Sequence, residues 1–372
     1  MRRLCVPPTA ALLAFLALAP VAMAQDAAKA EDKKVEEKKV EEKKTEEKPA
    51  ADKPAEPGTK LVVIHLENPS GVTVHPVTGH VFASSRQGIY RYAPATNKLY
   101  LEVKGFPTDE YGKGPKYNIG PLGVTLWGND RLIVPDGSQK DGDELVRIYK
   151  IADELPAKPR EATETEFALG PIKGNADGNY KGEGNYYAAA VWNDTIYVTA
   201  NGDDTKGWIV TSKIADGKPG ELTPAIATKE AVQVDAPVAI TVTPDSSYLV
   251  VGQMGEVNVP GDSLLSMYDK EGKLYKNYKT GLNDIAGLAY SPKTGKLYAT
   301  DFAWADEIKG NGGLFELIIE GDEVKPKKIL SLDRPTALAF DKDGRLYVTV
   351  FGTGKDTGDK PTGGLLRLEA GL

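Results

Sequence analysis

Short apolar runs separated by turn residues repeat along the chain from residue 60 to the C-terminus, and none has a helical period. The stretch from residue 283 to 317 is the clearest case, because strand-like runs alternate with the tight turn SPKTGK and a long polar loop. It predicts one antiparallel unit of four strands, at Gly287–Tyr290, Leu297–Thr300, Gly313–Leu317 and around Lys327–Leu330. Such a unit cannot bury its faces alone, so we expect it to recur.

The first strand of this unit occurs six times, as GVTV, GVTL, AAAV, AITV, GLAY and ALAF. Successive copies are 48 to 65 residues apart, which is the spacing of propeller blades; they begin at Gly71, Gly123, Ala188, Ala239, Gly287 and Ala337. Small and β-branched residues in these strands suit crowded positions near a central axis. The pattern predicts an all-β, six-bladed β-propeller of four-stranded antiparallel blades.

The last blade lacks its outer strand, because the chain stops four residues after the third strand, Gly364–Leu368. The apolar run Leu61–Leu66 at the other end can supply it. Pairing of the two termini would close the ring and leave only short strand edges. We therefore expect the propeller to span residues 59–372.

The N-terminal part of the chain has a different composition. Residues 1–24 predict a secretory signal peptide, with Arg2 and Arg3 before an apolar run and an A-x-A cleavage site at 22–24. The run is too short for a membrane span, so we expect no transmembrane segment in an exported, periplasmic or secreted protein. The only cysteine, Cys5, would be removed with the signal. Residues 25–58, rich in Lys, Glu, Pro and Ala, predict a solvated, disordered linker, with binding of cell-envelope polymers as the alternative.

The long polar loops precede first strands or follow second strands, which places them on one face of a propeller. Binding groups concentrate on such loops. The candidate ligand-binding residues there are Asn68, Asn118, Asp136, Asn185, Asn201, Asp235, Gln253, Asp284, Trp304 and Arg334. The alternative is that each Asn or Asp is a turn or cap residue. We expect Trp304 and Trp208 to be stacking residues, and Trp127 and Trp192 to be packing residues.

With its Pro-x-Gly anchors and Tyr-rich second strands, the chain resembles six-bladed propellers of the senescence-marker-protein/gluconolactonase/luciferin-regenerating family, and NHL-repeat propellers more loosely. The resemblance covers residues 60–372. It implies a calcium ion at the central mouth, held by a Glu, an Asn and an Asp. Glu67 and Asp301 match the two carboxylates. The Asn is missing, since its six possible positions hold Ser70, Leu122, Tyr187, Val238, Ala286 and Thr336.

Other site chemistries have little support in the sequence. The three histidines lie in the first copy, and His75 and His80 flank a turn, so we expect both at the surface. The acidic segments 136–144 and 175–183 lack the spacing of an EF-hand and signal calcium only weakly. The net charge of −7 disfavours binding to nucleic acid.

Three hypotheses follow. In the first, a monomeric exported propeller binds a small molecule, or a cell-envelope or extracellular protein, through its long-loop face. In the second, it is a calcium-dependent lactonase of the gluconolactonase type, with the metal as Lewis acid and an Asp as general base. In the third, it is a structural protein of the cell envelope with no ligand in the mouth.

Overall fold

The computed structural model describes residues 58–112, 114–175, 177, 182–202, 206–305, 307–352 and 360–372. The predicted signal peptide and residues 25–57 of the predicted linker lie outside the described residues, so both stay predictions. No helix in the described ranges is long and apolar enough to cross a membrane.

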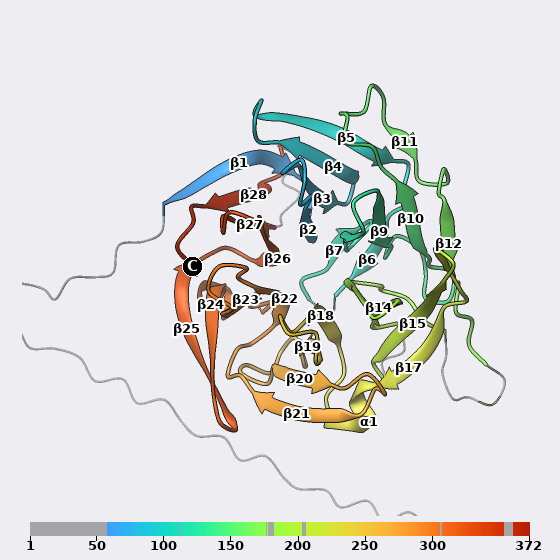
Figure 1. The fold of residues 1–372 in the computed structure, drawn as a ribbon. Coiled ribbons are helices and arrows are strands. Elements are labelled where there is room, and N and C mark those ends of the chain that lie inside the picture. Colours follow the sequence, from blue (N-terminus) through green and yellow to red (C-terminus); the bar gives the residue numbers. More distant parts are fainter. Residues whose placement is uncertain are drawn as a thin grey trace, which may run out of the picture. The chain divides into compact units, whose positions relative to one another are not determined.

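Six small antiparallel sheets surround a central axis, which confirms the six-bladed propeller (Figure 1). Blade 1 is β2 (Gly71–Val74), β3 (Val81–Ser85), β4 (Gly88–Ala93) and β5 (Lys98–Lys104), with β11 (Arg160–Glu161) parallel to β5. Blade 2 is β8 (Thr125–Trp127), β9 (Arg131–Pro135), β10 (Val146–Lys150) and β12 (Phe167–Leu169). Blade 3 is β13 (Ala189–Trp192), β14 (Thr195–Ala200) and β15 (Trp208–Ala215), with β16 (Lys218–Pro219) and β17 (Thr223–Ala227) both paired to β15.

The other three blades are regular. Blade 4 follows the short helix α1 (Thr228–Val232) and is β18 (Pro237–Val242), β19 (Leu249–Gln253), β20 (Leu264–Tyr268) and β21 (Leu274–Lys279). Blade 5 is β22 (Ile285–Tyr290), β23 (Leu297–Asp301), β24 (Gly313–Glu320) and β25 (Glu323–Ser331), with the 3-10 turn η1 (Lys309–Asn311) before β24. Blade 6 is β26 (Pro335–Phe340), β27 (Leu346–Val350), β28 (Gly363–Leu368) and β1 (Thr59–Leu66).

The ring closes as the sequence predicts, because β1 pairs antiparallel with β28 from Thr59↔Leu368 to Leu66↔Gly363. Val63 and Leu66 of β1 are buried in a cluster that includes Val72 and Val81 of blade 1. Strand β1 thus completes blade 6 and packs against blade 1, which joins the last blade to the first.

Two first strands begin later than predicted. The blade 2 strand starts at Thr125 rather than Gly123, and the blade 3 strand at Ala189 rather than Ala188. In blade 2 the facing residue is Pro135, which has no N–H, and its carbonyl accepts from both Leu122 and Gly123. In blade 3 the Ala188 N–H donates to the Thr199 hydroxyl in place of a strand carbonyl.

Hydroxyl groups at the inner ends of strands tie neighbouring blades together. The Ser84 hydroxyl donates to the Leu122 carbonyl over 2.6 Å, and the Thr199 hydroxyl donates to the Val238 carbonyl over 2.8 Å. The Thr336 hydroxyl spans the closing junction by donating to the Pro69 carbonyl over 2.8 Å. Thr300 makes the same contact with the Thr336 carbonyl. These hydroxyls are buried, so the bonds satisfy groups that water does not reach.

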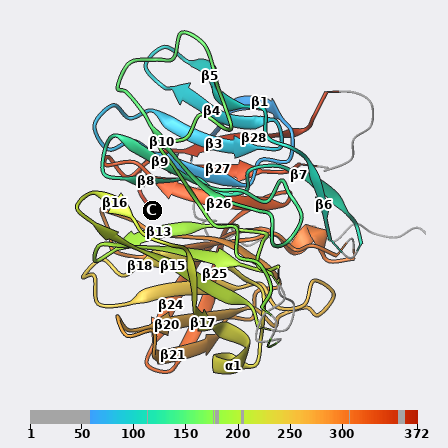
Figure 2. The same cartoon turned by 90° about the vertical axis from the view of Figure 1, so that its right-hand side faces the viewer.

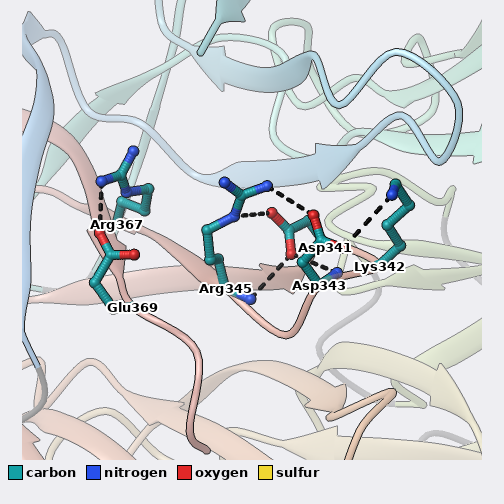
Figure 3. Close-up of polar contacts among 6 residues, drawn as sticks. All are labelled: Asp341, Lys342, Asp343, Arg345, Arg367 and Glu369. Carbon is teal, nitrogen blue, oxygen red and sulfur yellow. Dashed lines mark hydrogen bonds and ion pairs between the residues drawn. The ribbon is translucent and has the colours of Figure 1, made fainter. Parts of the chain in front are cut away.

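The turns between first and second strands use one polar side chain as a cap. Asp341 is the example in Figure 3: its Oδ1 accepts from the backbone N–H of Asp343 and Arg345, and its Oδ2 from Arg345 Nε. The neighbouring pair Arg367–Glu369 in the same view lies at the surface.

His75 has the same role in blade 1, and the prediction that it is a surface residue was wrong. Its Nδ1 lies within hydrogen-bond distance of the N–H groups of Val77 and Thr78, while Nε2 lies 2.7 Å from the Asn129 carbonyl of the next blade. The ring is 2% exposed because it fills the space between the two turns.

Replacing Asp341 with Ala is expected to lower the free energy of unfolding by about 1–3 kcal/mol, since it leaves the partly buried N–H groups of Asp343 and Arg345 without this acceptor. Urea unfolding measures the change. The matched control is Asp343→Ala, which loses exposed contacts with Arg345 and Lys342 and should cost less than about 1 kcal/mol. Equal losses in the two variants would show that the cap does not act as described.

Candidate functional site

Five aromatic residues close the axis on the long-loop face; we call them the aromatic plug. They are Tyr111, Tyr117, Phe302, Trp304 and Phe351. The Tyr117 ring centre lies 5.2 Å from that of Trp304 and 5.4 Å from that of Phe351, in edge-to-face contacts. Such contacts stabilise a rigid, dry cluster.

Two plug residues come from a hairpin that the sequence analysis treated as part of a long polar loop. The hairpin is β6 (Asp109–Tyr111) and β7 (Tyr117–Ile119), seen at one face of the ring in Figure 2. The Trp304 indole N–H donates to the Pro115 carbonyl over 3.1 Å, and Asn201 Nδ2 donates to the Tyr111 hydroxyl over 2.8 Å. In the sequence, the strand β7 is indicated by the alternation of Tyr117 and Ile119 around a polar residue.

Beneath the plug lies a mostly apolar cavity with an empty volume of about 590 Å³, including the space open to solvent. Starts of first strands, such as Ser70, Val238, Ala286 and Thr336, form its floor. Beyond it, the first strands of all six blades line the axial channel. The apolar lining and the plug leave little room for charged chemistry on the axis.

The polar hollow on this face lies beside the axis, over blades 2 to 4; we call it the acidic groove. Five carboxylates line it together with two amides and the edge of Tyr111. The residues are Asp109, Glu110, Tyr111, Gly112, Asp141, Asn185, Asn201, Gly202, Asp235, Ala236, Met254, Gly255, Glu256 and Val257. Lys116 pairs with Glu110, and Lys229 with Asp235 over 2.6 Å. The carboxylates that line the groove outnumber these lysines, so it favours neutral or cationic ligands over anions.

Four of the predicted ligand-binding residues lie at these two hollows. Asn185, Asn201 and Asp235 line the acidic groove, and both Asn side chains also border the cavity. Trp304 lines the cavity, is 6% exposed and packs among the plug rings, so its expected stacking role stays a prediction. Trp208 packs against the blade 2–3 core.

Three other predicted residues cap their own blades. Asp136 accepts from Ser138 N–H and pairs with Arg147 over 2.8 Å. Gln253 donates to the Asp235 carbonyl, and Asp284 Oδ2 accepts from Trp304 N–H over 2.6 Å. All three are buried, as the alternative of turn and cap residues requires.

The remaining predicted residues, Asn68, Asn118 and Arg334, lie in the segments that lead into the first strands. Asn68 and Arg334 have positive φ values of 44° and 49°, as does Asn185, in a left-handed turn before the first strand. Asn tolerates that conformation well. Asn68 Nδ2 donates to the carbonyl of Asn118, and the buried Arg334 guanidinium lies 5.9 Å from the Tyr117 ring centre.

The two expected calcium ligands have other partners. Glu67 forms a two-pronged ion pair with Arg86 and also accepts from Gln87. Asp301 Oδ1 accepts from the N–H of Asp284 and Ala303, and Oδ2 from the N–H and Nδ2 of Asn283. Within the described ranges, no group of three or more His, Cys, Asp or Glu side chains could hold a metal ion. The geometry therefore gives the predicted axial calcium site no support.

Two buried carboxyl groups have strongly shifted pKa values. Burial raises the pKa of Asp284 to about 7, with smaller contributions from Asp301 and Asp262, although its bond to the Trp304 N–H opposes the shift. Burial, followed by the nearby Asp141, raises the pKa of Glu144 to about 10. Glu144 was not among the predicted site residues, because a sequence does not show which acid of an acidic loop is buried.

Asp284 makes stability depend on pH. The folded protein holds its proton more tightly than the unfolded chain, so its contribution is complete below the ordinary pKa of 3.8 and is lost as pH rises to about 7. We expect the free energy of unfolding of Asp284→Asn to lack this decline. The stability of the variant relative to the wild type should therefore rise between pH 4 and 7. Thermal unfolding across this range measures it, and a difference independent of pH would contradict the assignment.

No protein family model matches the sequence, and no curated protein matches it either. Solved structures do match its fold. An oxidoreductase from Thermus thermophilus, named a glucose dehydrogenase, has a TM-score of 0.58 at 18% identity, covering 84% of this chain and 100% of its own. A PQQ-bound aldose sugar dehydrogenase from Streptomyces coelicolor has a TM-score of 0.54 at 17% identity, covering 85% and 99%.

A gluconolactonase from Xanthomonas campestris has a TM-score of 0.55 at 12% identity, covering 84% of this chain and 89% of its own. At these identities the likeness concerns the fold. The chain thus has a six-bladed propeller like that of the gluconolactonase, as the resemblance in its blades implied, and the sugar dehydrogenases share this fold.

Proposed function

We propose that this protein binds a neutral polyhydroxylated small molecule, an aldose or a sugar lactone, in the acidic groove. The observation that carries the proposal is the groove itself, where carboxylates and the Asn185 and Asn201 amides converge beside Tyr111. Carboxylates accept from sugar hydroxyls, amides both donate and accept, and an aromatic ring offers apolar surface to the C–H face of a sugar.

The charge of the groove selects among sugars. An aldonate would meet Asp109, Asp141 and Glu256 at short range, whereas an aldose or a lactone carries no charge. The names of the structural neighbours, glucose dehydrogenase, aldose sugar dehydrogenase and gluconolactonase, support the same ligand class. With the predicted signal peptide, binding would take place in the periplasm or outside the cell.

Lactone hydrolysis is the second candidate. It is favoured by Asp284, whose pKa of about 7 suits a general base, whose Oδ1 has no hydrogen-bond partner among the described residues, and whose Oδ2 bonds to the Trp304 N–H at the wall of the apolar cavity rather than in the groove. The quinone cofactor in the name of the Streptomyces neighbour does not fit this donor set, because PQQ is an anionic polycarboxylate and the groove is lined with carboxylates.

Calorimetric titration with glucose and with glucono-lactone tests the proposal. We expect Asn201→Ala to weaken binding by roughly threefold to tenfold, since it removes an amide of the groove together with its hydrogen bond to the Tyr111 hydroxyl. The control is Asn129→Ala, an exposed residue in the β8–β9 turn outside the groove, which should bind like the wild type.

Gluconate should bind more weakly than either neutral ligand. Absence of heat with both neutral sugars, or equal affinity of the two variants, would contradict the proposal. Lactone hydrolysis above the spontaneous rate that falls in Asp284→Asn would support the second candidate.

A further inference from the structure

Two loops of blades 2 and 3 bring carboxyl groups together beside the acidic groove. Glu144, at the end of the loop between β9 and β10, is fully buried. Its Oε2 accepts from the backbone N–H of Asn185, whose Nδ2 donates to Asp141 Oδ1 over 3.2 Å. A side chain at position 184 would overlap both carboxylates, so only Gly184 allows this approach.

Only one of the two carboxyl oxygens of Glu144 has a hydrogen-bond partner among the described residues. Its Oε1 has no hydrogen-bond partner, and among the described residues no lysine or arginine pairs with it. The charges nearest to it are the acidic Asp141, Asp136 and Asp109. A buried carboxylate among like charges is costly unless a cation or a proton compensates it.

We propose that Glu144 and Asp141 bind a calcium ion, which supplies the counter-charge at this place. Both carboxylates offer oxygen ligands, as calcium prefers, and neutral carbonyls and water would complete its shell of about six to eight ligands. Two carboxylates therefore suffice. The flexible geometry also favours calcium over magnesium, which demands a strict octahedron.

This site is separate from the axial site implied by the family resemblance, and it does not depend on sugar binding. It lies in the acidic segment 136–144, whose calcium signal in the sequence was weak. The ion would fasten that loop to Asn185, and both Asp141 and Asn185 line the acidic groove. Calcium would thereby fix one wall of the groove.

Calorimetric titration of the full chain with calcium alone, and with magnesium alone, tests the proposal; thermal unfolding in both ions is a second measure. Glu144→Gln keeps the shape of the side chain but removes one oxygen ligand and the ability to ionise on binding the metal. We expect calcium binding to weaken at least about tenfold in Glu144→Gln and in the exposed Asp141→Asn, because site charge tunes calcium affinity.

Two controls complete the design. Glu316→Gln changes a buried glutamate of blade 5 that pairs with lysines, and the double variant Glu67→Gln, Asp301→Asn removes the family-type axial pair. Both should keep calcium binding and the calcium-induced rise in unfolding temperature. The proposal would be overturned if the wild type did not bind calcium, or if Glu144→Gln and Asp141→Asn bound it unchanged. It would also be overturned if calcium binding were lost only in the axial double variant. If Glu144→Gln does not fold, Asp141→Asn still tests the proposal, because Asp141 is exposed and its substitution leaves the core intact.

Discussion

Removal of residues 59–66 is expected to cost more than about 5 kcal/mol of unfolding free energy and to leave no cooperatively folded ring. The deleted strand β1 forms the whole outer edge of blade 6, paired with β28 over its length. Val63 and Leu66 leave the core with it, at about 1.5–3 kcal/mol each. The exposed edge of β28 then becomes a template for aggregation. Thermal unfolding followed by circular dichroism measures the loss.

The matched control is a chain that begins at Gly58, directly before β1. It should unfold like the full-length protein, because it keeps the whole of β1 and every strand that the structure describes. A synthetic peptide of residues 59–66 should partly restore the truncated protein by adding a strand to β28. A truncated protein that still unfolds cooperatively within a few degrees of the wild type would show that β1 does not close the ring.

Replacement of Arg91 with Met is expected to lower the free energy of unfolding by about 3–5 kcal/mol. Arg91 Nε lies 2.9 Å from Glu102 Oε2, and both side chains are 2% exposed or less. Its Nη1 donates to the carbonyls of Ala152 and Glu154, so the guanidinium also joins blade 1 to the chain after β10. The variant leaves the buried Glu102 charge with the longer contact to Arg160 at 3.6 Å, and it leaves these carbonyls without the Arg91 donor.

A double-mutant cycle distinguishes the buried charge from the lost packing. Arg91→Met combined with Glu102→Leu should recover part of the stability, because a buried apolar pair is often no worse than an ion pair. The exposed pair Lys325–Glu320 is the control, and Lys325→Met should cost less than about 1 kcal/mol. A loss from Arg91→Met as small as that from Lys325→Met would contradict the role given to the buried pair.

Much of the scaffold could be predicted because each blade repeats the same local pattern. Alternating apolar strands and tight turns are encoded within about 50 residues, and the missing fourth strand of blade 6 identified Leu61–Leu66 as its completion. The predictions were wrong where one particular contact overrides the local pattern. His75 is buried only because its ring reaches Asn129, and Gly123 lies outside the ladder because Pro135 faces it.

The candidate site was less predictable, since its residues come from loops whose packing no local pattern specifies. Asn185, Asn201 and Asp235 do meet in one groove, as expected of loops that share a face. Asp136, Gln253 and Asp284 lie at similar sequence positions, yet their side chains turn inward to backbone groups. The sequence does not predict the aromatic plug, because Tyr111 and Tyr117 lie in a strongly polar stretch.

The central claim is that a neutral sugar binds in the acidic groove. The most direct measurement is an amide chemical-shift map of the isotopically labelled protein with saturating glucose, repeated with glucono-lactone. We predict shifts confined to the N–H groups of the groove, among them Asn185, Gly202 and Gly255, with no change in the turn capped by Asp341. Shifts clustered in that turn, or no shifts with either ligand, would contradict the account.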